Sequence, residues 1–159
     1  MFNLFLFLHI VTGMICLISG VFAMNSKKRR GRHTVSGSIY HWSYFVVFIT
    51  ALIMSVLHWE ESQHLFYIAL FSYTLALLGY LAAKKRWTKW LRSHISGMLG
   101  SYIGIVTATL VVNVRHIPIL NELPPLLFWL LPTIIGTPII FKVAKKYGPK
   151  KISRKISTI

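Results

Sequence analysis

The chain has 159 residues, of which 55% are hydrophobic and only 13% are charged, and its formal net charge at pH 7 is +15. Soluble domains normally carry about 25% charged residues, so this composition excludes an ordinary soluble fold and indicates a chain solvated by lipid. A charge this positive also suggests nucleic-acid binding as a function, but that function needs a basic face on a soluble module. The apolar blocks leave no room for such a module, and no nucleic-acid partner is expected.

Five apolar blocks follow one another along the chain, each near the roughly 20 residues that a helix needs to cross about 30 Å of hydrocarbon. None of them contains Asp, Glu, Lys or Arg. The sequence therefore predicts an all-α integral membrane bundle, a single domain over residues 1–141, followed by a basic tail over residues 142–159. The predicted spans are 2–24, 38–57, 65–83, 95–114 and 126–141.

The first span carries a histidine in its apolar interior. His9 lies on the same helical stripe as Gly13, Cys16 and Gly20. An imidazole in this position is expected to face the bundle and to need a polar partner there, such as a hydroxyl, a carbonyl or a ligand.

The fourth and fifth spans carry packing signals. Small residues in membrane helices let two backbones approach closely, and the fourth span is rich in them: Gly97, Gly100, Ser101, Gly104 and Ala108. In the fifth span Pro132 and Pro138 flank Gly136, which predicts a kinked or partly broken helix. Such a break either lines a transport cavity or packs against neighbouring helices.

Basic residues are distributed very unequally between the connecting segments. The connections after the first and third spans and the tail hold 17 of the 18 Lys and Arg residues, whereas Arg115, Glu60, Glu61 and Glu122 lie in the other connections. Cytoplasmic loops collect Lys and Arg, so the N-terminus is predicted outside and the C-terminus inside a bacterial plasma membrane. The basic face is expected to contact anionic lipid headgroups.

Seven histidines form two predicted layers. His33, His41 and His94 lie near the cytoplasmic ends of the spans, and His9, His58, His64 and His116 lie toward the outer side. Two layers of imidazoles are typical of small b-type cytochromes. His41 and His94 are the expected inner pair, His9 is the third candidate ligand, and haem b is the cofactor that this hypothesis implies. The alternative interpretation makes His33, His58, His64 and His116 interfacial anchors.

Other chemistry finds less support in the sequence. No two histidines show the i, i+4 spacing of a helical zinc site, and the spans contain no carboxylate for such a site or for a hydrolytic triad. No metal site and no catalytic residue are predicted on this basis.

Three short segments resemble a family of bacterial multi-pass membrane proteins known as domain of unknown function 2306. They are His9-Ile10-Val11-Thr12-Gly13 with Gly20 further on, His33-Thr34-Val35-Ser36-Gly37-Ser38-Ile39-Tyr40, and Trp90-Leu91-Arg92-Ser93-His94. The resemblance implies a small helical bundle and names no activity. It singles out His9, Gly13, His33, Gly37, Tyr40 and His94 as positions of interest.

These observations predict a multi-pass plasma-membrane protein with a candidate histidine site inside the bundle. One alternative is a haem- or quinone-dependent redox protein, which would make the chain a membrane oxidoreductase. Another is a small transporter, or an assembly subunit that binds a larger membrane complex or a second copy of itself.

Overall fold

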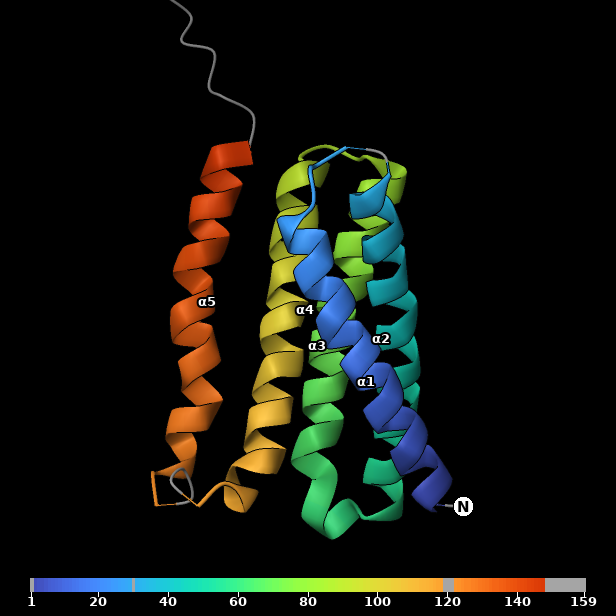
Figure 1. Ribbon diagram of the computed structural model, residues 1–159, viewed down its shortest axis with the longest axis vertical. Helices are drawn as coiled ribbons and strands as arrows, with labels where there is room; N and C mark the ends of the chain where they lie inside the picture. The colour runs from blue at the N-terminus through green and yellow to red at the C-terminus, as the bar shows by residue number, and fades with distance from the viewer. Residues whose placement is uncertain (1, 30, 119–121, 148–159) are drawn as a thin grey trace, which may run out of the picture.

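The computed structural model describes residues 2–29, 31–118 and 122–147, and these residues form five α-helices (Figure 1). The helices are α1 (Phe2–Asn25), α2 (Arg32–Leu57), α3 (Trp59–Lys85), α4 (Trp90–Asn113) and α5 (Pro125–Tyr147), and one 3₁₀ turn, η1 (Val114–His116), follows α4. Each α-helix is long and apolar enough to cross a membrane. The prediction of an all-α protein with five such helices is confirmed.

Four helices extend well beyond the apolar blocks that predicted them, and one of these, α4, begins at Trp90 rather than at residue 95. α2 begins at Arg32 rather than at residue 38, α3 begins at Trp59 rather than at 65, and α5 continues to Tyr147 rather than ending at 141. Hydropathy marks only the part of a helix that lipid can solvate, whereas backbone hydrogen bonding continues into polar residues until a helix breaker intervenes. Gly31, with φ 117°, is such a breaker before α2.

The C-terminal segment is correspondingly shorter than expected. Lys142, Lys145 and Lys146, which were assigned to the basic tail, belong to the last turns of α5. Cations at this position interact favourably with the C-terminal end of the helix dipole. The rest of the expected tail, residues 148–159, lies outside the described residues.

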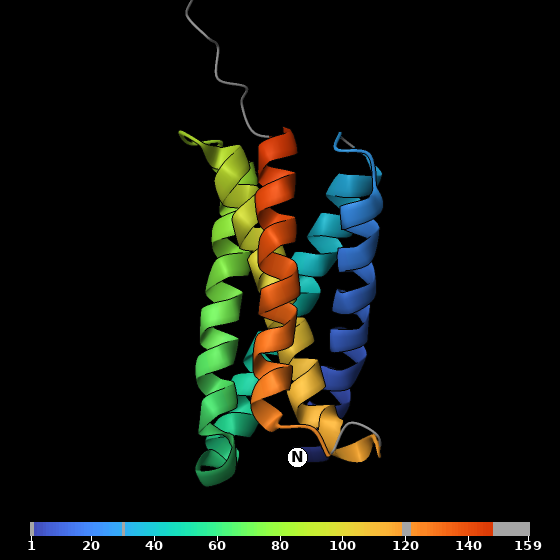
Figure 2. The ribbon, with the colours of Figure 1, turned by 90° about the vertical axis from the view of Figure 1, so that its left-hand side faces the viewer.

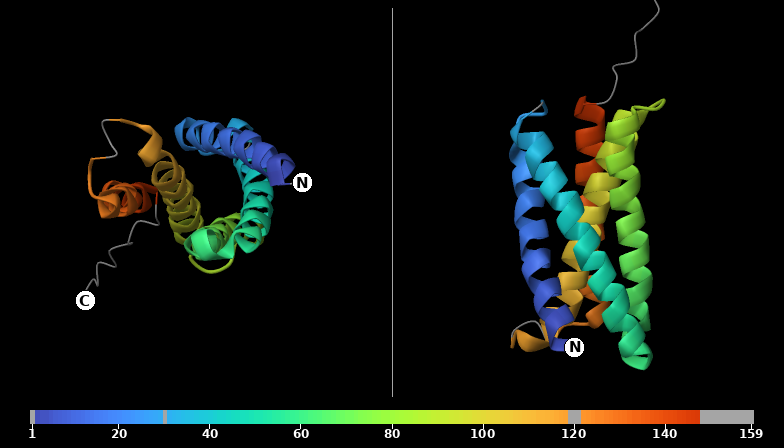
Figure 3. Two further views of the ribbon diagram at one scale, coloured as in Figure 1. Left: turned by 90° about the horizontal axis from the view of Figure 1, so that it is seen from below. Right: turned by 90° about the vertical axis from the view of Figure 1, so that its right-hand side faces the viewer.

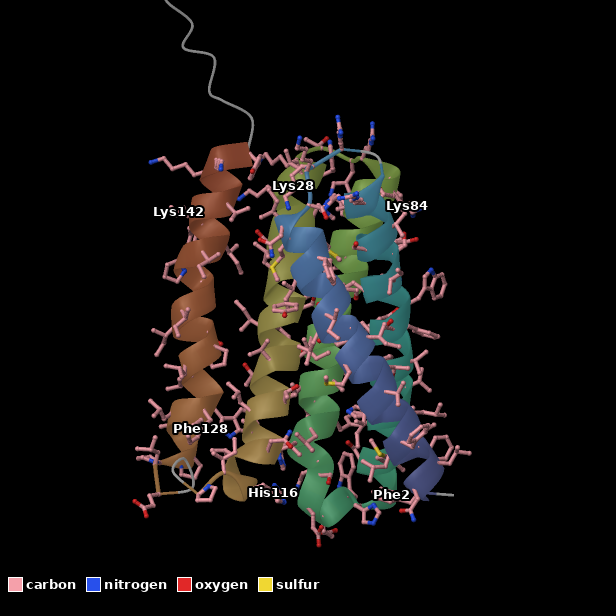
Figure 4. The ribbon with its side chains drawn as sticks, in the orientation of Figure 1. Phe2, Lys28, Lys84, His116, Phe128 and Lys142 are labelled. Carbon is pink, nitrogen blue, oxygen red and sulfur yellow. The ribbon has the colours of Figure 1, made fainter. Side chains whose placement is uncertain are left out.

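Successive helices run in opposite directions, which separates the charges. The α1–α2 connection, the α3–α4 connection and the C-terminal end of α5 lie at one end of the molecule, here called the basic end (Figure 1). Lys28, Lys84 and Lys142 lie at or near this end, whereas Phe2 and His116 lie at the other (Figure 4). The three glutamates therefore lie opposite the basic end, Glu60 and Glu61 in the first turn of α3 and Glu122 before α5.

Helices α1 to α4 form a ring in chain order, and α5 packs against α4 from outside (Figure 3). Figure 2 shows α5 standing in front of α4. The ring closes between α4 and α1, where the Tyr102 hydroxyl donates a hydrogen bond to Leu17 O at 3.2 Å. Gly20 makes room for this contact, because a Cβ there would lie 2.5 Å from the Tyr102 ring.

The α3–α4 contact brings two backbones together. A Cβ on Gly97 would lie 2.6 Å from Leu75 O and 2.8 Å from the Cα of Gly79, and a Cβ on Gly104 would overlap the side chain of Ser72. Gly100 faces Leu75 with more room, Ser101 is fully buried, and Ala108 is half-buried. Glycine at the crossing therefore sets the distance between α3 and α4.

Helix α5 is uninterrupted through both of its internal prolines. A kinked or partly broken helix was expected, and the break is absent from α5, so the transporter hypothesis loses one of the two features that motivated it. Membrane helices tolerate proline where neighbouring groups accommodate the missing hydrogen bond, and Pro132 is buried in the described structure. Gly136 accommodates the Ile103 side chain of α4, so the prolines and the glycine serve helix packing.

The crossing predicts a difference between two glycine substitutions. Gly97→Ala should lower the free energy of unfolding in detergent by about 1–3 kcal/mol, because the added methyl group has no free space. Gly37→Ala is the matched control, since nothing lies within 4 Å of a Cβ there, and alanine should leave stability unchanged or raise it by up to about 1 kcal/mol. An equal loss of unfolding free energy in the two variants would contradict the role of Gly97 in setting the distance between α3 and α4.

Candidate functional site

His33 links the start of α2 to the end of α1. Its Nδ1 lies 2.9 Å from Ala23 O. Lys28 Nζ donates to the same carbonyl at 3.1 Å and also to Met24 O. Both side chains thus satisfy carbonyls that the last turn of a helix leaves without backbone partners. Desolvation against this helix end lowers the pKa of Lys28.

His94 links α4 to α3 at the same end of the bundle. Its Nδ1 lies 2.9 Å from Gly79 O, a carbonyl within α3. The close approach of Gly97 to Gly79, less than one turn further along α4, brings the imidazole within reach of that oxygen. The glycine contact and the histidine contact are therefore parts of one arrangement.

The two imidazoles form a pair. The ring centroids of His33 and His94 are 6.1 Å apart, and the ring planes are perpendicular, at 89°. A carbonyl oxygen can only accept a hydrogen bond, so Nδ1 carries the proton in each ring, and Nε2 of the neutral imidazole keeps its lone pair. Histidines that ligate metals are commonly held in this way, with the other ring N–H bound to a carbonyl or carboxylate.

His41 has a different neighbour from the one expected. Its ring stacks flat on Tyr80, with centroids 3.9 Å apart and planes at 1°, and its Nδ1 is buried without a hydrogen-bond partner among the described residues. The imidazole that packs beside His94 is that of His33. Eight residues separate His33 from His41, which rotates the two side chains by about 80° around an ideal helix and directs them to different neighbours.

This pairing was missed because the start of α2 was placed too late. With a helix beginning at residue 38, His33 belongs to a loop and is interpreted as an interfacial anchor. With α2 beginning at Arg32, His33 lies within the first turn and is half-buried. The family resemblance had already included this histidine.

About two helical turns further into the bundle, buried hydroxyl groups link α2 to α4 by hydrogen bonds. Ser101 Oγ donates to Met98 O at 2.9 Å, so the Tyr40 hydroxyl, 2.8 Å away, is the donor of the hydrogen bond that links α2 to α4. The Tyr44 hydroxyl donates to Ser101 O at 3.1 Å. Tyr40 lies seven residues after His33 on α2, and Ser101 lies seven residues after His94 on α4. The hydroxyl groups are therefore about 10 Å deeper in the bundle than the histidine pair.

The remaining histidines do not form a second pair. His9 Nδ1 lies 3.0 Å from Thr50 Oγ1, so the polar partner expected for this ring is a hydroxyl of α2. His58 packs on Phe2, His64 lies 5.9 Å from Trp129 between ring centroids, and His116 is exposed. Of the motif glycines, Gly13 makes ordinary contact with Val47, and Gly37 faces open space.

The basic end offers two imidazoles and several cations. No group of three or more His, Cys, Asp or Glu side chains that could hold a metal ion occurs in the described segments. Lys28, Arg32 and Arg92 belong to the same end, by their place in the chain. The site can supply two neutral nitrogen ligands within surroundings that favour an anionic group.

The buried hydroxyl cluster gives a test of how the site is supported. Ser101→Ala should destabilise the protein more than Tyr40→Phe, because it leaves the buried tyrosine donor without its acceptor, at a cost of about 1–3 kcal/mol. Detergent unfolding of both variants and of the double variant should yield a coupling energy of about 1 kcal/mol. Tyr67→Phe, at a tyrosine that is 59% exposed, is the control and should not lower the free energy of unfolding. If the losses of unfolding free energy in the two single variants add up to the loss in the double variant, the hydrogen bond between Tyr40 and Ser101 is contradicted.

Comparison with family models matches residues 6–137 to the family described as Predicted membrane protein (DUF2306). The match extends from α1 into α5 and includes His9, His33, Tyr40 and His94. No curated protein and no solved structure matches the chain. The resemblance that the three short segments indicated is confirmed, and the chain belongs to this family of predicted membrane proteins.

Proposed function

We propose that this protein is a small membrane electron carrier that holds one haem b at its basic end, with His33 and His94 as axial ligands. The observation that carries the proposal is the pair of imidazoles whose Nδ1 atoms are both bound to backbone carbonyls. His94 was a candidate ligand from the sequence, and His33 takes the place that had been expected for His41. His9 and His41 have no ligand role in this proposal.

The spacing of the pair suits a shared metal centre. Imidazole nitrogens bind metals at about 2 Å, which separates two ring centroids by about 5–6.5 Å, depending on the angle at the metal. The 6.1 Å between His33 and His94 falls within this interval. Perpendicular ring planes do not prevent both Nε2 atoms from binding the same centre.

Charge and ligand number favour haem over a bare metal ion. A structural zinc ion usually needs four ligands, whereas haem brings four nitrogens of its own and requires only axial ligands from the protein. Haem also carries two carboxylates, which suit surroundings with Lys28, Arg32 and Arg92 nearby. His33 and His94 would together hold such a haem, leave no ligand position for a substrate, and so confine the chemistry that it would supply to electron transfer.

The proposal predicts a coloured protein. Protein purified in detergent after expression with adequate haem supply should show a Soret band. His33→Ala and His94→Ala should each lower the haem content by at least about tenfold, because each removes one axial ligand.

The matched controls are His41→Phe and His9→Gln. Phenylalanine can keep the flat contact with Tyr80, glutamine can keep a hydrogen bond to Thr50, and both variants should retain the band. A colourless wild-type protein would overturn the proposal, as would an equal loss of haem in all four variants.

We also propose that the basic end faces the cytoplasm of a bacterial plasma membrane, with the N-terminus outside. The support is the accumulation of Lys and Arg in the connections at one end of the bundle, as in cytoplasmic loops generally. The same residues would attract anionic lipid headgroups by roughly 1 kcal/mol each.

Two fusions test this orientation. A green fluorescent protein attached to the C-terminus should fluoresce, because it folds in the cytoplasm, and alkaline phosphatase at the same position should be inactive. The opposite pair of results would require the inverted topology.

A further inference from the structure

An open groove of about 370 Å³ lies between α3 and α5, away from the histidine pair. α4 forms its floor through Gly100, Gly104 and Thr107, Tyr67 and Ser72 of α3 contribute to one wall, and Trp129 and Thr133 of α5 contribute to the other. Most of the exposed lining is apolar. The lining residues lie within helices that are long enough to cross the membrane, so the groove opens sideways to lipid.

The groove follows from how α5 is attached. α5 packs on α4 through the buried residues Phe128 and Pro132 and through Gly136, which receives Ile103. Figure 4 shows Phe128 on the side of α5 that faces α4. Between this contact and α3, Gly100 and Gly104 of α4 form the floor, and both glycines face α3.

The walls carry three polar groups among apolar side chains: the Tyr67 hydroxyl, the Trp129 indole N–H and the Thr133 hydroxyl. Thr107, on the floor, donates to Ile103 O at 2.9 Å. Thr133 lies seven residues, or about 10 Å, into the apolar block of α5 that begins at residue 126, whereas Tyr67 lies two residues into the block of α3 that begins at residue 65. At the depth of Thr133 hydrocarbon offers a polar group no hydrogen-bond partner, so a ligand with an acceptor oxygen would lower its free energy.

We propose that this groove binds a lipid-soluble ring compound with carbonyl oxygens, of the quinone class, which enters from the bilayer. Its volume lies within the range of small-molecule sites, about 300–1,000 Å³. Ring carbonyls accept hydrogen bonds from Tyr67, Trp129 or Thr133, and the apolar walls receive the ring faces and the tail. A plain acyl chain fits the apolar surface but offers the three donors no acceptor. The proposal rests on the groove alone and does not require haem at the other site.

Binding can be measured by titrating ubiquinone-1 into the protein in lipid nanodiscs and following tryptophan fluorescence. Quenching should be saturable, and Trp129→Phe should lose most of it. Tyr67→Phe should weaken binding by about fivefold, as for the loss of one hydrogen bond. Thr133→Phe, which fills the groove, should weaken it by at least about tenfold.

Ile134→Phe is the matched control, since Ile134 neighbours Thr133 on α5, is 63% exposed and does not line the groove. It should bind ubiquinone-1 as the wild type does. Equal quenching in the Thr133 and Ile134 variants would show partitioning into lipid and overturn the proposal. Equal competition by squalane, a branched hydrocarbon without carbonyl groups, would assign the groove to lipid chains instead.

The same titration on His33→Ala separates this proposal from the haem proposal. Undiminished binding to that variant is expected, because the groove and the histidine pair share no residues. Loss of ubiquinone-1 binding there would contradict an independent site. If His33→Ala loses the Soret band but still binds ubiquinone-1, the result concerns only the haem proposal.

Discussion

The backbone contact between Gly79 and Gly97 is the constraint on which the basic end of the bundle depends. In lipid the hydrophobic effect does not drive helices together, so dispersion contacts between closely packed backbones must hold α3 against α4. The same contact brings Gly79 O within reach of His94, which fixes the tautomer and the position of that ring. A side chain at either glycine would separate the helices and release the imidazole.

Several ring and hydroxyl groups inside the bundle, at different depths, follow one rule. The rings of His9, His33 and His94 and the hydroxyls of Tyr40 and Tyr44 all bond to a neighbouring helix. Because the bilayer core offers no water, such bonds specify which helices are neighbours as well as adding stability. His41 Nδ1 departs from the rule and relies on aromatic stacking for its environment.

Hydropathy and charge were sufficient to predict five helices, because the solvent of a membrane helix selects apolar residues over a known length. They could not place the ends, since helix hydrogen bonding does not stop where apolar residues stop. That limit affected the candidate site: the predicted span begins six residues after the start of α2, which placed His33 in a connection and left His41 as the apparent partner of His94. The break expected at Pro132 and Pro138 failed for another reason, because proline removes only its own donor and α4 packs against that stretch.

The position of α5 outside the ring bears on the order in which the protein is made. The four helices that hold the histidine pair, and the carbonyls that orient it, all precede residue 114 in the chain. The ring can therefore close in the membrane while α5 is still being synthesised, and α5 can dock afterwards on α4. The groove beside α5 requires this last helix, whereas the arrangement of the histidine pair does not.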